Sequence, residues 1–131
     1  MKYLLDTVVW LWSVGETERI GRDGLDVLAN GRSEVYLSAA SVWEIAIKAK
    51  LGKYKLPEAP GSYVRSRMAA QHILPLPITH NHTLAVYDLS LHHQDPFDRL
   101  LIAQALAEDM VILTSDRIFG RYPAQLLWCG K

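Results

Sequence analysis

The chain has 131 residues, of which 50% are hydrophobic and 21% are charged, a composition typical of one compact domain and unlike that of a disordered segment. Lysine plus arginine and aspartate plus glutamate each number 14, so the formal net charge is zero. This balance excludes bulk electrostatic attraction as the basis for binding a polyanion. A bound cation or a local basic surface would still allow nucleic acid to bind.

The cysteine content and the apolar segments indicate the cellular location. Cys129 is the only cysteine and cannot form an internal disulfide, which favours a reducing cytoplasm. The apolar start MKYLLDTVVWLW is interrupted by Asp6 and lacks a small-residue cleavage site, so we expect no signal peptide. No apolar run approaches the roughly 18 residues of a membrane helix. We expect one cytoplasmic domain covering residues 1–131, with no membrane partner.

The hydrophobic pattern predicts alternating strands and helices along the chain. Strands are predicted at residues 2–5, 34–37, 73–77 and 110–113, with a weaker one at 125–128. Helices are predicted at 7–14, 17–30, 39–51, 62–71, 79–91 and 96–108. Two prolines in 73–77 suit an edge strand. This alternation predicts an α/β fold, a three-layer α/β/α sandwich with a mostly parallel central sheet.

Acidic residues stand where such a fold gathers ligands. Asp6 ends the first predicted strand, and Asp116 follows the fourth. In parallel sheets, ligands bind outside the carboxyl ends of the strands. Each acid also has a simpler reading, because either one is placed to cap the turn or helix after it.

The segment DPFDRLLIAQALAEDMVILTSD contains two further acids, Asp95 and Asp98, for which the sequence predicts different roles. Asp95 is a natural N-cap, with Pro96 at the first helical position. Asp98 lies at the third helical position, where it would answer the cap, but it also falls in the apolar stripe of Leu101 and Ile102. An ionised carboxylate in that stripe needs a partner of opposite charge. Capping and function both stay open for Asp98.

Glu44 is a fourth acid with apolar neighbours. In SAASVWEIAIKAK it can pair with Lys48 one helical turn later, or close a capping box with Ser41. Taken together, Asp6, Glu44, Asp98 and Asp116 would converge on one edge of the sheet. Clustered carboxylates raise one another's pKa unless a cation holds them. Hard oxygen ligands favour Mg²⁺ or Mn²⁺ over zinc, and such a site suits phosphodiester hydrolysis.

The histidines and tryptophans carry less information. His80, His82, His92 and His93 fall in predicted helix edges or loops, and we expect them at the surface, since no catalytic triad can be read from their positions. The tryptophans follow apolar runs, and we expect all of them in the core; they are Trp10, Trp12, Trp43 and Trp128. The glycine-containing segments lack the order of a P-loop or a dinucleotide fingerprint.

Three segments resemble the PIN-domain family, in particular the VapC-like ribonuclease toxins of type II toxin–antitoxin systems. YLLDTVVWLW resembles the family's opening strand, with Asp6 as its first acid. LSAASVWEIAIKAKLGK is similar to the second acidic segment, with Glu44. DPFDRLLIAQALAEDMVILTSD carries the most specific likeness, with Asp98 as the third acid and Asp116 as the fourth, more variable one. Val8, Val9 and Trp10 stand where relatives often carry a histidine, so that histidine's role has no counterpart here.

The resemblance implies a Mg²⁺-dependent endoribonuclease, with Mn²⁺ expected to substitute, that acts as a homodimer and is silenced by a cognate antitoxin protein. Asp6 and Asp98 would bind the metal directly, and Glu44 and Asp116 directly or through water. Supporting hydrogen bonds are expected from Thr7, Thr114 and Ser115, and phosphate contacts from Lys48, Arg99 and Arg117.

Two other functions fit part of the sequence. A phosphatase of the haloacid-dehalogenase type also begins with an aspartate after its first strand, but it needs a second acid two residues later, where this chain has Val8. A non-catalytic PIN-like binding module would not need all four acids. The sequence favours the nuclease, and it identifies neither the RNA substrate nor the antitoxin.

Overall fold

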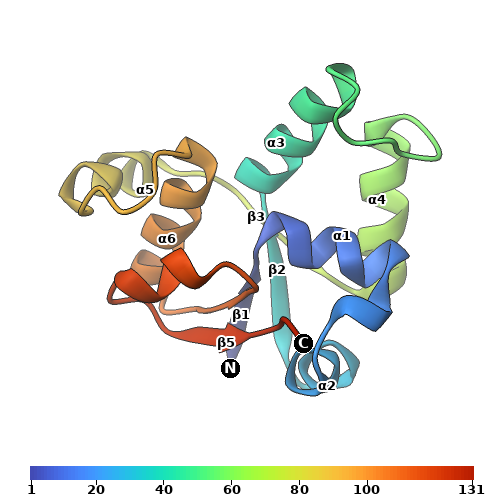
Figure 1. The fold of residues 1–131 in the computed structure, drawn as a ribbon, viewed down its shortest axis with the longest axis horizontal. Helices are drawn as coiled ribbons and strands as arrows, with labels where there is room; N and C mark the ends of the chain where they lie inside the picture. The colour runs from blue at the N-terminus through green and yellow to red at the C-terminus, as the bar shows by residue number, and fades with distance from the viewer.

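A computed structural model describes residues 1–131 and contains one parallel sheet of five strands (Figure 1). The strands are β1 (Lys2–Leu5), β2 (Glu34–Ser38), β3 (Leu74–Leu76), β4 (Val111–Thr114) and β5 (Leu126–Trp128). They lie in the order β3-β2-β1-β4-β5, and every neighbouring pair is parallel. The predicted α/β class is confirmed, β3 lies at an edge as its prolines predict, and the weak fifth strand is present.

Helices cover both faces of this sheet. They are α1 (Thr7–Gly15), α2 (Arg22–Ala29), α3 (Ala39–Lys50), α4 (Pro60–Gln71), α5 (His80–Ala85) and α6 (Pro96–Glu108), with short 3-10 helices η1 (Thr17–Arg19), η2 (Val86–Asp88) and η3 (Arg117–Arg121). In Figure 1, α1, α2 and α4 lie to the right of the sheet and α5 and α6 to the left. None of these helices is long and apolar enough to cross a membrane.

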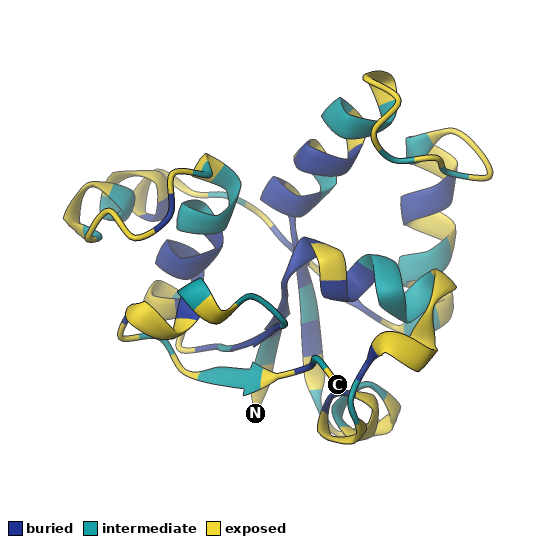
Figure 2. Ribbon diagram, in the orientation of Figure 1, coloured by how far each residue is buried: buried dark blue, intermediate teal, exposed yellow.

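Alternate residues of the strands build two cores, one on each face of the sheet. Leu5, Leu37 and Leu113 point to the face where α1, α2 and α4 pack. Leu4 and Ile112, one position earlier on β1 and β4, point to the opposite face and pack against α6 and η3. Because successive strand residues point to opposite faces, these short apolar strands are buried on both sides. Figure 2 shows the buried residues concentrated in the sheet and on the inner faces of the helices.

Two predicted helices are shorter than expected. The helix predicted at 17–30 is split into η1 and α2 around Ile20 and Gly21. Gly21 lies where its N–H donates to the Cys129 carbonyl at 2.8 Å, and a side chain there would meet the Gly130 carbonyl. The helix predicted at 79–91 gives way to η2 after Ala85. At Gly21, a contact with a distant part of the chain redirects the backbone.

A buried polar network, here called the brace, joins the sheet to α5 and α6. The Ser38 hydroxyl donates to Gln104 Oε1 at 2.5 Å, and Gln104 Nε2 approaches His82 Nδ1 at 3.3 Å. The Thr79 N–H also donates to His82 Nδ1, so the ring proton is on Nε2, which donates to Glu108 at 2.7 Å. His82 is 1% exposed, so the surface prediction for it was wrong.

The tryptophan prediction holds for only part of the set. Trp10 is fully buried, and its Nε1 donates to Gln71 Oε1 at 3.0 Å. Trp43 is 58% exposed and Trp128 is 44% exposed, so the core prediction was wrong for both. Trp43 packs edge-on against Phe97 on α6 instead of entering the core.

Candidate active site

Four elements bring the predicted acids to the carboxyl edge of the sheet. Asp6 follows β1 and Asp116 follows β4, which are neighbouring strands. Glu44 lies on α3 and Asp98 in the first turn of α6, and these two helices pack against each other. The four carboxylates are close enough for their charges to affect one another's pKa values. Burial, followed by the charges of Asp6, Asp95, Glu44 and Asp116, raises the pKa of Asp98 to about 8.

Asp6 is the innermost of these acids. It is 5% exposed, and although it precedes α1 its side chain makes no capping hydrogen bond. The Thr114 hydroxyl donates to its Oδ2 at 2.9 Å, as the supporting role of Thr114 predicts. Burial raises the pKa of Asp6 to about 6, against the opposing effect of that hydrogen bond. Helix capping therefore does not explain this carboxylate.

Glu44 is held from one side only. Lys48 Nζ lies 2.5 Å from its Oε2, the predicted pair one turn along the helix. Its Oε1 is buried and has no hydrogen-bond partner. The alternative capping box with Ser41 is absent, because α3 begins earlier and Ser38 is its cap. An unpartnered carboxylate oxygen in the interior is costly unless a cation or donor binds it.

Asp98, at the third position of α6, does not cap this helix. Asp95 accepts from the backbone N–H groups of Phe97 and Asp98, as its N-cap reading predicts. The Asp98 carboxylate is thereby left without a capping role, and its side chain is 19% exposed. Its Oδ2 lies 3.9 Å from His93 Nε2. The apolar stripe thus carries a half-buried carboxylate with like charges around it.

Asp116 serves two purposes at once. Its Oδ1 accepts from the Ile118 N–H at 2.9 Å and so caps η3, which is the simpler reading given for it. Its Oδ2 lies 3.1 Å from His93 Nε2. Because an ionised carboxylate only accepts, that histidine nitrogen carries the proton. Asp116 is therefore oriented by the backbone on one side and by a histidine on the other.

His93 is the functional candidate that the sequence did not reveal. It is 5% exposed, so the surface prediction was wrong here too. Its ring stacks on Tyr122 and meets Phe119 edge-on. The backbone N–H of His93 donates to the Tyr122 hydroxyl at 2.8 Å. His93, Asp98 and Asp116 each offer a ligand atom, all within 4.8 Å of one another. Its position just before Asp95-Pro96 was the available signal, but its burial depends on residues much later in the chain.

Several supporting residues lie elsewhere than expected. The Thr7 hydroxyl donates to Ser41 Oγ instead of a carboxylate, and Ser115 makes no hydrogen bond to the acids. The Arg99 guanidinium donates to the backbone carbonyls of Val86, Leu89 and Ser90, so it holds the segment after α5, and its phosphate contact stays a prediction. Arg117 lies 5.4 Å from the Trp128 ring centroid and stays exposed beside Asp116.

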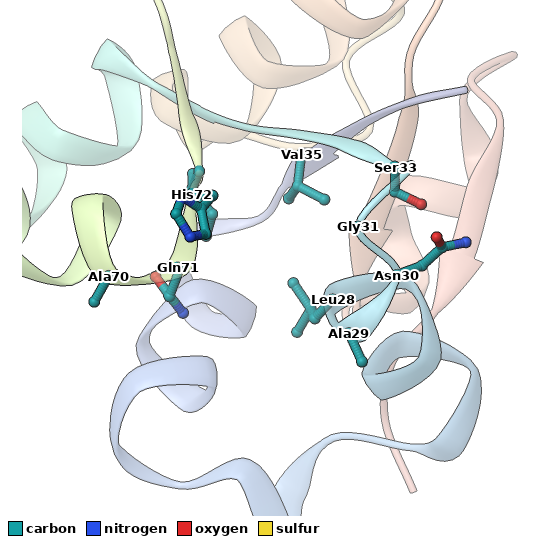
Figure 3. Close-up of a pocket in the computed structure, with 10 residues that line it drawn as sticks. Leu28, Ala29, Asn30, Gly31, Ser33, Val35, Ala70, Gln71 and His72 are labelled. Atoms are coloured by element: carbon teal, nitrogen blue, oxygen red, sulfur yellow. The ribbon is translucent and has the colours of Figure 1, made fainter.

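The donor set fits a hard divalent cation. Four carboxylates converge, two have strongly raised pKa values, and a buried oxygen of Glu44 has no partner. A cation bound among them would relieve both the repulsion and the unpaired oxygen. A hollow at the opposite edge of the sheet does not offer this chemistry. It measures about 410 Å³, lies at the amino ends of β2 and β3, and contains no carboxylate; its lining includes Leu28, Val35 and His72 (Figure 3).

The fold and the site together define an α/β protein with a carboxylate-lined centre at the carboxyl edge of a five-stranded parallel sheet. The sequence pattern of the PIN domain matches residues 3–125, and the chain belongs to the PIN-domain family.

Known proteins resemble the chain in sequence and in fold. Over 71 residues it is 44% identical to ribonuclease VapC16 of Mycobacterium tuberculosis, a match that covers 54% of this chain and 45% of that relative. The chain thus matches about half the length of this relative. VapBC2 of Rickettsia felis, solved with a promoter DNA fragment, contains a chain of the same fold (TM-score 0.74, 18% identity, 98% of this chain and 99% of that one). So does DNA-bound VapBC of Salmonella typhimurium (TM-score 0.75, 16% identity, 97% of each chain).

Proposed function

We propose that the protein is a metal-dependent endoribonuclease, the toxin of a VapC-like toxin–antitoxin pair. The observation that carries the proposal is the convergence of Asp6, Glu44, Asp98 and Asp116, where burial and then the neighbouring like charges raise the pKa of Asp98 to about 8. The likeness to a ribonuclease supports the choice of RNA, and the structural neighbours described as toxin–antitoxin complexes support an antitoxin partner. The proposed cofactor is Mg²⁺, with Mn²⁺ as a substitute, and the proposed assembly is a homodimer.

Each acid has a proposed task. Asp6 and Asp98 would bind the metal directly, while Glu44 and Asp116 would do so directly or through water. When bound, the cation would supply charge neutralisation at the phosphate and a more acidic attacking water. Thr114 holds the Asp6 carboxylate in one orientation, and His93 does the same for Asp116. Lys48 orients Glu44 from one side, with its ammonium 2.5 Å from Oε2.

The test is cleavage of RNA by purified protein with Mg²⁺ or Mn²⁺. Asp98→Asn keeps the shape of the side chain and removes its charge, so we expect cleavage to fall more than about 100-fold, beyond the 10–100-fold cost of losing an outer-shell residue. Asp109→Asn is the matched control. Asp109 is exposed at the far end of the same helix, with φ 55°, a conformation that asparagine also adopts.

Circular dichroism must show both variants folded. Cleavage by Asp98→Asn close to that of the wild type would contradict the site. Absence of metal-dependent cleavage by the wild type, with tight binding of RNA or a partner protein, would favour the non-catalytic binding module.

A further inference from the structure

The charges of this neutral protein are unevenly placed around the acidic site. Lys48, Lys50, Lys53 and Lys55 occur close together, and no acidic residue falls between positions 45 and 57. On the other side of the site, the stretch 86–116 holds a single cation, Arg99, whose guanidinium is bound to backbone carbonyls, and its acids nearest the site are Asp95, Asp98 and Asp116. A polyanion bound at the site is therefore repelled on the α6 side and attracted on the α3 side.

The lysines lie on the last turn of α3 and the loop after it, and this segment is tied to the acidic site. Gly52 has φ +77°, which turns the chain sharply after α3. The N–H groups of Lys53 and Tyr54 then both donate to the Lys48 carbonyl, at 2.8 and 3.2 Å. The Lys48 side chain lies 5.4 Å from the Tyr54 ring centroid and also pairs with Glu44. One lysine thus links the carboxylate cluster to the following residues, here called the basic loop: Lys50, Lys53, Tyr54 and Lys55.

The cations of the basic loop are exposed and unpaired. Lys50, Lys53 and Lys55 are exposed, and none has a carboxylate within salt-bridge distance. Nearby arginines differ, since Arg19 pairs with Glu16 and Arg67 with Glu58. The loop borders a hollow of about 420 Å³ against the end of α1 and one side of α4, with Tyr54, Lys53 and Lys55 among its lining residues. In Figure 2 the loop between α3 and α4 is drawn largely in the colour of exposed residues.

We propose that the basic loop binds the phosphate backbone of single-stranded RNA next to the bond held at the acidic site, an inference that rests on the proposed function. Lysines spaced along an exposed loop provide sequence-independent contacts to phosphates. Tyr54 lies half-buried among them, and an aromatic ring between cations is the combination that single-stranded nucleic acid surfaces use for stacking bases. The loop thereby sets the direction in which the strand leaves the site.

Binding measured without cleavage tests the loop separately from the chemistry. All proteins carry Asp98→Asn, and affinity for an unstructured RNA oligonucleotide is measured by fluorescence anisotropy over a range of salt concentrations. The triple variant Lys50→Ala, Lys53→Ala and Lys55→Ala should bind at least tenfold more weakly in low salt. The slope of log affinity against log salt should become shallower by about 2, or roughly 0.7 for each cation lost.

A control triple removes the same charge from segments outside the basic loop: Lys2→Ala, Arg22→Ala and Arg32→Ala, all exposed and unpaired. Its slope should stay that of the parent. Tyr54→Leu should weaken binding about fivefold or more without changing the slope. An equal loss in both triples, or none in the basic-loop triple, overturns the proposal. A preference of the parent protein for duplex RNA over single-stranded RNA overturns it too. So does a basic-loop triple that no longer binds a coexpressed antitoxin but keeps its RNA affinity.

Failure of this inference is separable from failure of the proposed function. Suppose that the wild type cleaves RNA, that the basic-loop triple with Asp98 intact cleaves it equally well, and that the same triple with Asp98→Asn binds it equally well. The nuclease proposal then stands and the loop assignment falls. If the wild type cleaves no RNA but the triple variant loses salt-dependent binding, the RNA surface stands and the catalytic proposal falls.

Discussion

Helix α6 carries polar side chains into the interior at two levels, and the two clusters differ in how completely their atoms are paired. In the brace, every step from Ser38 through Gln104 and His82 to Glu108 is a hydrogen bond. At the first turn of the same helix, Asp98 faces other carboxylates, and Glu44 Oε1 has no partner. Since buried polar groups are normally satisfied, the unpaired cluster is the one that is incomplete without a ligand. The brace is complete and serves structure.

The brace should therefore matter for stability and not for chemistry. Gln104→Leu keeps a side chain of similar size but leaves the buried Ser38 hydroxyl without its acceptor and the Pro77 carbonyl without the Gln104 donor, and we expect a loss of about 3 kcal/mol in the free energy of unfolding. Urea denaturation measures it, with RNA cleavage assayed well below the melting temperature and expected to be unchanged. Gln125→Leu, at an exposed glutamine, should change stability by less than about 0.5 kcal/mol. A large loss of cleavage in folded Gln104→Leu would erase the distinction between the clusters.

His93 lies at the border of the acidic site and should show its effect in the chemistry. His93→Phe keeps a ring between Phe119 and Tyr122 but removes the hydrogen bond to Asp116, so we expect RNA cleavage to fall about 10–100-fold. His92→Phe, at the exposed neighbour, should leave cleavage unchanged. Thermal melting checks that His93→Phe is folded. Full activity in that variant would mean that Asp116 needs no partner.

The acidic site should make the metal-free protein pH-sensitive. The pKa of Asp98 is raised from 3.8 to about 8 by burial and neighbouring charges, so between these values the folded state holds a proton that the unfolded state has lost. Stability in EDTA is therefore highest below about pH 4 with respect to this group and falls as pH rises towards 8, by up to about 1.4 kcal/mol per pH unit. Asp98→Asn should flatten the profile, and Asp109→Asn should not. A wild-type profile that is flat in EDTA from pH 5 to 8 would contradict the electrostatic account.

The smallest expected effect concerns Asp98 at neutral pH. In EDTA the folded wild type holds a proton on Asp98 that the unfolded chain has released at this pH, whereas asparagine needs no proton, so Asp98→Asn should stabilise the protein by about 1 kcal/mol or more. In millimolar Mn²⁺ the order should reverse, since the wild type binds the ion more tightly and gains more in melting temperature. Equal gains in both proteins would mean that Asp98 is not a ligand.

The elements that the sequence predicted well are those whose signals are local. Asp95 and Pro96 mark the start of α6, and the predicted helix at 96–108 matches the observed one. The position of the acids at strand ends followed from the parallel topology, which fixes where such residues meet. The structural role of Arg99 could not be predicted from the sequence. Its guanidinium is taken by the carbonyls after α5, and that contact exists only once the tertiary structure forms.

The misassigned residues share this dependence on distant segments. His93 reads as a loop residue until Phe119 and Tyr122 enclose it. The break in the helix predicted at 17–30 depends on Gly21 meeting the end of the chain. The prediction for Trp43 was wrong in the opposite direction: Trp43 was expected in the core, but it lies at a helix position that no core element covers. The hydrophobic pattern identifies apolar residues, but it does not show whether another helix or strand packs over them in the folded protein.

The hydrogen bond between Thr114 and Asp6 joins residues 108 positions apart, and the strands that carry them lie side by side. During synthesis, Asp6 and Glu44 leave the ribosome long before β4 exists to pair with β1. Contacts of such sequence separation form late, because the intervening chain must first be ordered. A nascent chain would thus carry half of the carboxylates without the other half, and the proposed activity would arise only when the last third had been made. Translation itself would set a delay in which an antitoxin, already folded, could meet each new molecule.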